Sequence, residues 1–248
     1  MLNIDNLHAY YGKSHVLHGV SFNVQPGEIV ALLGRNGSGR STTAKAIMGL
    51  VDCQGDINWK GQQILGKKAF QIAHLGLGYV PENRDIFPKL TVHQNLLLGQ
   101  KGQGKGARWS FEDMYQMFPR LLDRQHTEAG VLSGGEQQRL ALARVLASEP
   151  EMILLDEPFS HLDGGLRKKL IHYLLELRRV RNTTVLLVSH DGSETLGLSD
   201  RIVLMKKGRI VRVGNPLSFY YKPKSLEDGR IFGVMNSVRI GSERFHFR

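Results

Sequence analysis

The sequence predicts an α/β fold with a mainly parallel sheet, and three observations carry this prediction. An apolar run at residues 29–33 leads into a Gly-rich turn and then into a segment, up to Leu50, whose apolar residues have helical spacing. Two further runs, at residues 152–155 and 184–188, are short and continuously apolar, which is typical of strands buried in a parallel sheet. A helical pattern over residues 164–181, with leucines on one face, separates these two runs.

The composition is that of a globular chain of 248 residues, with one domain or one domain and an appendage. No run approaches the roughly 18 apolar residues that a membrane-spanning helix needs, so we expect no such helix. The formal net charge of +10 suits a polyanion such as a nucleotide, a nucleic acid or an anionic lipid, or else it is a solvated basic surface. The single cysteine, Cys53, leaves no intrachain disulfide, and the N-terminus has no signal pattern, so we expect a cytoplasmic protein.

The Gly-rich turn matches the pattern G-x-x-x-x-G-[K]-[ST], the P-loop that cradles phosphates, except that Arg40 stands at the lysine position. Its three glycines let the backbone wrap closely around a phosphate, towards which the N–H groups of the following helix point. Ser41 fits the hydroxyl that binds Mg²⁺. The alternative is a turn that merely joins a strand to a helix, but the motif requires the strand and helix that flank it here.

A second anion site is predicted at residues 132–136, Leu-Ser-Gly-Gly-Glu, which precede a helical pattern over residues 136–147. Its two glycines again aim helix N–H groups at an anion. One chain seldom needs two phosphate cradles for one nucleotide. Two copies of the chain that face each other would need both.

Polar residues also follow three of the predicted strands, where the loops of α/β sheets bind ligands. Asp156 and Glu157 end the run at 152–155, where the first can hold Mg²⁺ and the second can polarise a water molecule. Glu82 follows a short apolar run at 77–80, and His190 lies just beyond the last buried strand. The alternatives are a capping aspartate, surface glutamates and a structural histidine.

Residues 2–24 predict two strands around a turn, and Tyr11 lies just before that turn. An exposed aromatic ring there could stack on adenine, although its spacing alone favours an ordinary core or edge tyrosine. Residues 201–213 predict a hairpin. From Asn215 onward, prolines and charged residues predict a surface tail.

These motifs together resemble the ATPase subunits of ATP-binding cassette (ABC) transporters over residues 2–220. The resemblance rests on the P-loop, the LSGGE signature at 132–136, the ILLDEP Walker B segment at 153–158, the S-H-L-D loop at 160–163 and the switch histidine, His190. The first part looks like the subunits of branched-chain amino acid and urea importers, in which Glu often stands at the position of Glu82. After about Gln137 the chain looks more like ferric-ion or polyamine importer subunits.

The resemblance implies a P-loop NTPase core with a mainly parallel sheet, an N-terminal antiparallel β subdomain and an inserted α-helical signature subdomain. The ATPase domain would span residues 1–220, with the helical subdomain at about 84–148. Residues 221–248 would be a C-terminal tail or the start of a truncated β accessory domain.

The resemblance also implies roles for single residues. Tyr11 would stack on adenine, Ser41 and Asp156 would hold Mg²⁺, Glu157 would be the general base, and His190 would contact the γ-phosphate. Glu82 would sense the nucleotide and contact the membrane subunit. The phosphates would be cradled by Gly34, Asn36, Gly37, Ser38, Gly39, Arg40, Ser41 and Thr42, and the γ-phosphate held by the opposite protomer would be bound by Ser133, Gly134, Gly135 and Glu136.

We therefore expect an ATP- and Mg²⁺-dependent ATPase that energises an importer of a small solute, with the branched-chain amino acid or urea type favoured. Its partners would be membrane permease subunits and a second, identical or different, ATPase subunit in a head-to-tail dimer. It would lie peripherally on the cytoplasmic face of the inner or plasma membrane.

The sequence also leaves two alternative functions open. One is a nucleotide-binding subunit that hydrolyses ATP poorly because of Arg40. The other is a non-transport cassette protein acting on nucleic acid or ribosomes. Such proteins usually carry two cassettes or a long coiled coil, neither of which is present, so no nucleic acid partner is expected.

Overall fold

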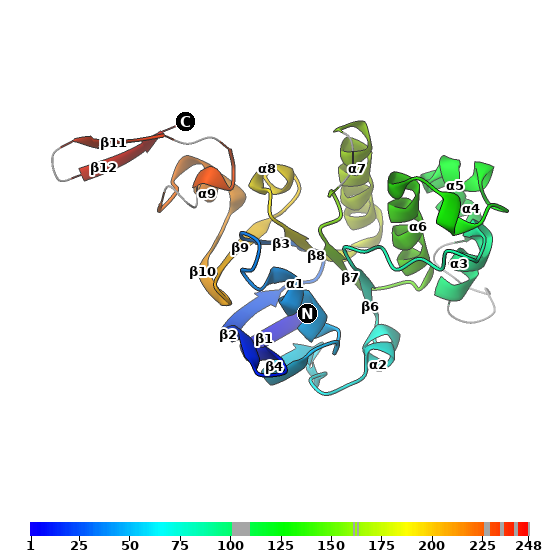
Figure 1. Cartoon of the computed structure of the whole chain (residues 1–248), viewed down its shortest axis with the longest axis horizontal. Coiled ribbons are helices and arrows are strands. Elements are labelled where there is room, and N and C mark those ends of the chain that lie inside the picture. The colour runs from blue at the N-terminus through cyan, green and yellow to red at the C-terminus, as the bar shows by residue number, and fades with distance from the viewer. Residues whose placement is uncertain are drawn as a thin grey trace. The chain divides into compact units, whose positions relative to one another are not determined.

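The computed structural model describes residues 1–100, 110–160, 162, 164–225, 229–233, 236–240 and 243–247, the last two stretches by their backbone alone. The chain forms two compact units (Figure 1). The first unit combines Met1–Lys67 with Leu186–Arg248, and the second is Lys68–Val185.

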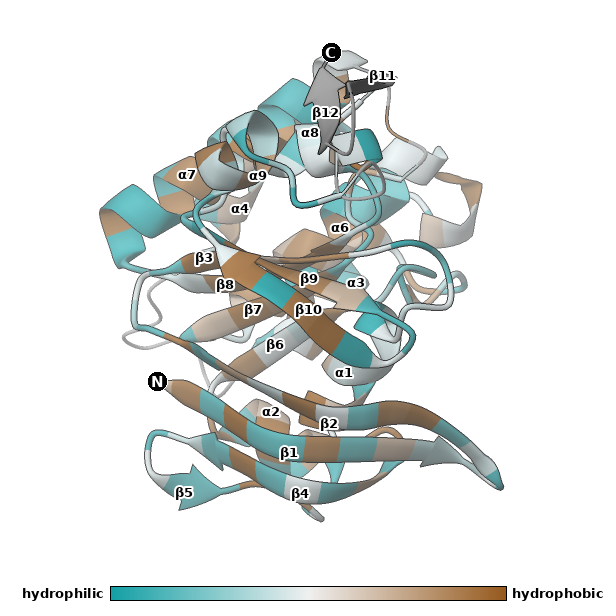
Figure 2. Ribbon diagram, turned by 90° about the vertical axis from the view of Figure 1, so that its left-hand side faces the viewer, coloured by the Kyte–Doolittle hydropathy of each residue, from teal (hydrophilic) through white to brown (hydrophobic). Residues whose placement is uncertain are grey.

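An antiparallel sheet opens the first unit, with the strand order β2-β1-β4-β5. Its strands are β1 (Leu2–Tyr11), β2 (Ser14–Val24), β4 (Asp52–Trp59) and β5 (Gln62–Gln63). Apolar and polar residues alternate along β1 and β2, as Figure 2 shows, and apolar residues such as Leu2, Ile4 and Leu7 are buried. The strands predicted on either side of a turn in residues 2–24 are therefore confirmed.

The remaining strands of this unit surround β3 (Ile29–Leu33), whose five residues are all buried. The strand order is β10-β9-β3-β8. Here β9 (Arg201–Lys206) runs parallel to β3, β10 (Arg209–Gly214) runs antiparallel to β9, and β8 (Thr184–Ser189) enters the unit with its last residues. Helix α1 (Arg40–Ile47) follows β3 after the Gly-rich turn. The strand, turn and helix that the motif requires are all present.

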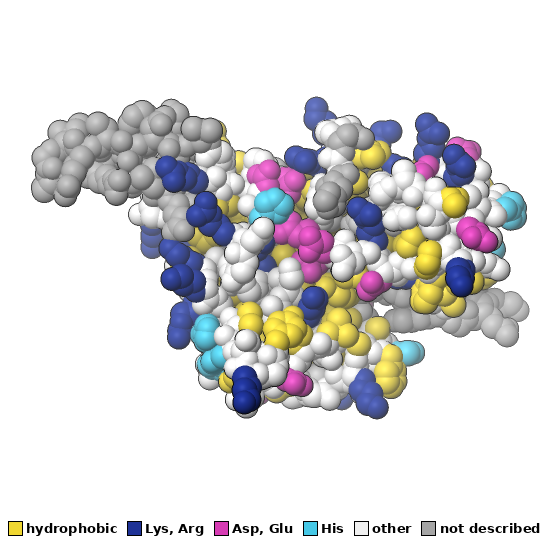
Figure 3. Space-filling model, in the orientation of Figure 1, with side chains coloured by type: hydrophobic (Ala, Val, Ile, Leu, Met, Phe, Trp, Pro, Cys, Tyr) yellow, Lys and Arg dark blue, Asp and Glu magenta, His cyan; other side chains and the backbone are white. Residues whose placement is uncertain are grey.

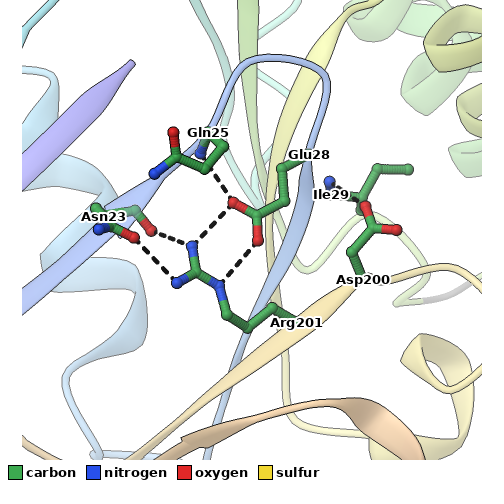
Figure 4. A network of polar contacts seen from close by, with 6 residues as sticks. All are labelled: Asn23, Gln25, Glu28, Ile29, Asp200 and Arg201. Carbon is green, nitrogen blue, oxygen red and sulfur yellow. Dashed lines mark hydrogen bonds and ion pairs between the residues drawn. The ribbon is translucent and has the colours of Figure 1, made fainter.

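A polar network fixes the end of β3 that lies away from this turn (Figure 4). The Arg201 guanidinium forms an ion pair with Glu28, Nε to Oε1 at 2.8 Å, and donates to the backbone oxygen of Asn23 at 2.6 Å. Asp200 Oδ2 accepts the N–H of Ile29 at 2.9 Å. The start of β9 therefore holds the start of β3, which sets the position of the strand that leads to the Gly-rich turn.

The segment after β10 differs from the predicted surface tail. Pro216 is the first residue of helix α9 (Pro216–Tyr221), and the side chain of Asn215 caps this helix by accepting the N–H of Leu217 at 2.8 Å. Phe219 is fully buried, and Phe232 is 4% exposed. Both rings pack in an apolar cluster with Ala31, Leu33, Ile202 and Leu204. The prediction was wrong here because the prolines and charged residues concealed two aromatic residues that pack in one cluster with residues of β3 and β9.

The last two strands, β11 (Asn236–Ile240) and β12 (Glu243–Phe247), form an antiparallel pair.

The second unit carries most of the helices. Strands β6 (Leu77–Val80) and β7 (Met152–Asp156) pair in parallel, and α3, α4 and α5 pack against α6 (Figure 1). Its described helices are α2 (Ala69–His74), α3 (Val92–Gly99), α4 (Phe111–Met117), α5 (Pro119–Asp123), the short 3₁₀ helix η1 (Ala129–Val131), α6 (Gly134–Ala147) and α7 (Gly164–Arg181). Helix α8 (Gly192–Thr195) belongs to the first unit.

These features confirm the predicted α/β class, with an antiparallel N-terminal sheet, mainly parallel strands elsewhere and an inserted group of helices. In the described part of the chain, no helix has both the length and the hydropathy that a bilayer crossing requires.

Candidate active site

The turn between β3 and α1 wraps closely enough to cradle a phosphate. Gly39, with a φ of 101°, caps α1 in the left-handed conformation, and a Cβ there would lie 2.6 Å from Leu17 Cδ2. A Cβ on Gly34 would lie 2.5 Å from the backbone oxygen of Met205. Only glycine fits both positions, so the backbone can curl around the site while the first N–H groups of α1 point into it.

Two polar side chains of the turn are buried. Arg40, 6% exposed, donates from Nη2 to Asn36 Oδ1 at 3.4 Å, which keeps its guanidinium beside the turn. Ser38 Oγ has no hydrogen-bond partner within the described residues. A buried, unsatisfied hydroxyl in a tight glycine turn fits a site built for a polar ligand. The residues present therefore fit a nucleotide phosphate.

Basic side chains line two depressions along the outer rim of this turn. One, of about 190 Å³, is lined by Arg35, Ser38, Lys206 and Lys207 among others. The other, of about 390 Å³, is lined by Arg35 and His190 together with residues near α8. His190 follows β8 and is exposed, and it thus shares a depression with a residue of the turn. Within the first unit, the structure brings these two predicted site elements together.

Lys and Arg side chains also gather over β9, β10 and α9 in Figure 3. Lys206, Lys207 and Arg209 are exposed there. Of these, Lys206 and Lys207 also line the smaller depression.

Tyr11 ends β1 and is 46% exposed. The neighbouring Tyr10 is engaged elsewhere, because its ring stacks on His15 with centroids 4.5 Å apart and an angle of 16° between the ring planes. Of the two tyrosines before the turn, Tyr11 presents more accessible ring surface to a ligand.

Two carboxylates end strand β7 in the second unit. Asp156 is 2% exposed, and its Oδ2 accepts a hydrogen bond from Tyr79 Oη at 3.2 Å. Glu157 is 7% exposed and has a φ of 49°, a left-handed conformation that costs about 1–2 kcal/mol for a residue other than glycine. Ser160 holds this turn, since its N–H and Oγ both donate to the backbone oxygen of Glu157, at 3.1 and 2.7 Å. Strain of this kind gathers at functional sites.

Glu82 lies at the same edge of the strands as this carboxylate pair. It follows β6, whose Val80 is paired with Leu155 of β7. Glu82 is exposed, whereas Asp156 and Glu157 are buried. Within the second unit, the three carboxylates that the sequence singled out thus follow two neighbouring strands at the same edge.

Two polar side chains fix the loop that runs from Glu82 to α3. Arg144 of α6 donates from Nη2 to the backbone oxygen of Asp85 at 2.6 Å, and its guanidinium lies 5.1 Å from the centre of the Phe87 ring. Asn95 of α3 is fully buried, accepts the N–H of Phe87 at 2.9 Å and donates to three backbone oxygens of the loop. The loop is therefore bound to both helices.

The N-terminus of α6 is closed by a capping box. Ser133 Oγ accepts the N–H of Glu136 at 3.4 Å, and Glu136 Oε2 accepts the N–H and hydroxyl of Ser133 at 2.9 and 2.8 Å. Burial opposes the ionisation of Glu136, but the Ser133 hydroxyl and N–H, with Arg139 and Arg124 nearby, lower the pKa of this carboxyl overall. A Cβ on Gly134 would lie 3.4 Å from Arg84 Nη2, so the loop after Glu82 reaches this N-terminus too.

Sequence reasoning missed Tyr79, Asn95 and Arg144. The roles of Arg144 and Tyr79 cannot be derived from local spacing, because Arg144 acts on a residue 59 positions away and Tyr79 on one 77 positions away. In the S-H-L-D loop, His161 and Asp163 lie outside the described residues.

A glycine turn opening α1, a strained Asp-Glu pair after a buried strand and a capped Gly-Gly helix are the parts of an ATP-binding cassette. Residues 17–160, more than half of the chain, match the family model described as ABC transporter. The chain therefore belongs to the ABC transporter family, as an ATP-binding subunit.

Named relatives agree with this assignment. The chain is 36% identical over 241 residues to the Fe(3+) ions import ATP-binding protein FbpC 2 of Haemophilus influenzae, covering 94% of this chain and 67% of that protein. It is 37% identical over 226 residues to the high-affinity branched-chain amino acid transport ATP-binding protein BraG of Pseudomonas aeruginosa, covering 90% and 97%. The resemblance to both kinds of subunit is thus confirmed.

The fold is shared with solved cassettes. One is the dimeric structure of MJ0796, a bacterial ABC transporter cassette, with a TM-score of 0.77 and 27% identity, covering 87% of this chain and 99% of that one.

Proposed function

We propose that this chain hydrolyses ATP with Mg²⁺ as the energising subunit of an ABC importer. The carboxylate pair at the end of β7 carries this proposal. Asp156 is buried and oriented by Tyr79, and Glu157 is held in a strained turn by Ser160. A carboxylate held at a strand end can accept a proton from an attacking water.

Each residue then has a role in phosphoryl transfer. The turn at 34–42 would bind the phosphates through its backbone N–H groups, and Ser41 and Asp156 would hold Mg²⁺. The metal, when bound, supplies positive charge to the phosphate oxygens. Glu157 accepts the proton of the water, His190 contacts the γ-phosphate, and the ring of Tyr11 stacks on adenine.

The partners follow from the second anion site. Residues 133–136 bind the γ-phosphate of a nucleotide on a second ATPase subunit, in a head-to-tail dimer. The dimeric form of MJ0796 supports the pairing of two ATPase subunits. Glu82 contacts the permease, so the chain lies peripherally on the cytoplasmic face of the membrane.

The solute that we favour is a branched-chain amino acid or urea. The likeness to BraG and the glutamate at position 82 support this choice, whereas the likeness to FbpC 2 favours Fe³⁺. The choice can be tested by uptake of radiolabelled leucine, urea and Fe³⁺ into vesicles that contain this chain and its co-purified permease. Uptake of Fe³⁺ alone would reject our assignment.

Glu157→Gln tests the ATPase assignment. We expect the variant to bind ATP as the unmodified chain does and to lose turnover by at least 10²-fold, because an amide cannot accept the proton. ATP binding can be followed with a fluorescent analogue, and turnover by phosphate release. Glu149→Gln, in a short turn before β7, is a matched control that should keep full activity. Unchanged turnover in Glu157→Gln would reject the role of Glu157.

A second candidate function has one specific observation in its favour. Arg40 replaces the lysine of the P-loop, and its guanidinium is buried against Asn36. On this hypothesis the chain binds ATP but hydrolyses it poorly. A comparison with Arg40→Lys, given in the Discussion, separates the two functions.

A further inference from the structure

His190 lies in a short turn that is organised by Ser189. Ser189 Oγ accepts the N–H of Asp191 at 3.1 Å and donates to Glu194 Oε2 at 2.8 Å. Asp191 in turn caps α8 by accepting the N–H of Ser193 at 2.8 Å. Helix α8 has only four residues, and so short a helix is not stable on its own. The position of this turn, and of His190 within it, therefore depends on what the turn packs against.

The described segment 229–233 supplies that contact. The N–H of Gly192 donates to the backbone oxygen of Ile231 at 2.9 Å, which satisfies one of the N–H groups that the first turn of a helix leaves open. The ring of Phe232 lies directly against Gly192, because a Cβ on this glycine would be 2.5 Å from Phe232 Cδ1. Gly192 does not have a positive φ, so this ring is what requires glycine there.

Phe232 also packs within the apolar core of the first unit. It is 4% exposed and belongs to the apolar cluster that contains Ala31 and Leu33 of β3. Since β3 leads directly into the P-loop turn, the ring that packs against Gly192 shares an apolar cluster with the strand before that turn. Arg230 and Ile231 also line the 390 Å³ depression that Arg35 and His190 share.

We propose that Phe232, assisted by the backbone of Ile231, is a positioning residue for His190. The ring sets the distance between β3 and the turn at 189–194, and thereby the place of the imidazole relative to the phosphate cradle. This inference rests on the proposed ATPase function. Because a misplacement of about 1 Å can lower a rate by about 10²-fold, a shift of this turn lowers kcat while ATP binding, which depends on the backbone of the cradle, is kept.

Gly192→Ala is the sharpest test, since one methyl group must push the turn away from Phe232. We expect kcat to fall by about 10-fold or more, with the Kd for ATP within about twofold of the unmodified chain. Gly197→Ala makes the same change where no atom lies within 4 Å of the new Cβ, and it should keep full turnover. The melting temperature of both variants shows whether they are folded.

The partner substitution is Phe232→Ala, matched by Phe219→Ala in the same apolar cluster. Both remove a buried ring, but only Phe232 contacts Gly192. We expect both to lower the melting temperature and only Phe232→Ala to lower kcat by about 10-fold. In the double variant Gly192→Ala/Phe232→Ala, the methyl group enters the space that the ring has left, so its kcat should be no lower than that of Phe232→Ala.

Three results would overturn the inference: full turnover in Gly192→Ala, equal loss of kcat in the two phenylalanine variants, or additive losses in the double variant. Glu157→Gln should be measured in parallel, because it shows whether a failure concerns the positioning role or the proposed ATPase function. If turnover depends on Glu157 but not on Gly192 and Phe232, only the positioning role fails.

Discussion

Arg40 occupies the position at which a P-loop normally has a compact ammonium group. Its guanidinium is longer and planar, and its charge is spread over three nitrogens. In this chain it is 6% exposed and donates to Asn36 at 3.4 Å. The backbone N–H groups of the cradle do not depend on the side chain at position 40, so binding and turnover respond differently to it.

We therefore expect Arg40→Lys to change ATP affinity by less than about tenfold. If the chain is a poor ATPase because of Arg40, the variant should raise kcat by roughly 10²-fold or more. Lysine restores a point charge that can bridge the β- and γ-phosphates. The measurement is steady-state phosphate release beside a direct binding titration. Arg120→Lys, at an exposed position of the second unit, is the control for the change of residue type. Equal kcat values for Arg40→Lys and the unmodified chain would show that this turn accommodates arginine.

The residues of the P-loop and the carboxylate pair could be found from the sequence because each follows its strand directly. Local spacing sets their positions, so a short pattern is enough. The strain at Glu157 could not be predicted, because its φ of 49° depends on the turn that Ser160 closes. The contact of Phe232 with Gly192 joins residues 40 positions apart, and the surrounding prolines and charges concealed it.

At the level of elements, the loop between β6 and α3 depends on two helices. Its backbone contains two consecutive left-handed residues, Arg84 and Asp85, with φ values of 67° and 44°. Such residues persist only where their surroundings hold them. Arg144 and Asn95 provide that support, which links the loop after Glu82 to the helix that carries the signature.

Arg144→Met should release this loop. The substitution keeps an apolar stem but removes the donor to Asp85, and a hydrogen bond from a charged group contributes about 1.5–3 kcal/mol. We expect the free energy of unfolding to fall by about that amount, and amide hydrogen exchange to rise in residues 82–91. Arg139→Met makes the same change on a face of α6 that lines a pocket with Tyr173. Exchange in 82–91 that is equal in both variants would contradict the role of Arg144.

The start of α6 could be predicted from the sequence, but the contacts of α6 with the neighbouring loop could not. The sequence predicted the helix after residues 132–136, and the capping box of Ser133 and Glu136 explains its start. The binding of the neighbouring loop to α6 was not predictable, because Arg144 contacts a backbone oxygen that any residue would offer.

At the level of the whole molecule, the signature is expected to act on the nucleotide of a second subunit. Ser133→Arg should then abolish hydrolysis and leave ATP binding by a single chain intact. The new side chain places bulk and positive charge at the positive end of α6, where a γ-phosphate should bind. Turnover should be measured over a range of protein concentrations, because hydrolysis by a dimer falls steeply on dilution.

A matched control separates this effect from the loss of a helix cap. Ser110 closes α4 with the same kind of capping box, and Ser110→Arg removes a cap at a cost of about 1 kcal/mol without touching the signature. If the two variants lose equal turnover, or if the unmodified chain keeps its full specific activity at high dilution, the head-to-tail arrangement is rejected.

The ion pair between Arg201 and Glu28 also has a consequence for the protein while it is being synthesised. The two residues are 173 positions apart, so at 5–20 residues per second the ribosome needs about 10–35 s to deliver the arginine after the glutamate. Throughout that interval β3 has no β9 beside it, although Lys68–Val185 has been synthesised by its end. An unpaired, wholly apolar strand is prone to aggregate. A nascent chain of this protein therefore needs protection until β9, in its last fifth, has emerged, and stalling of translation before Arg201 should leave it dependent on chaperones.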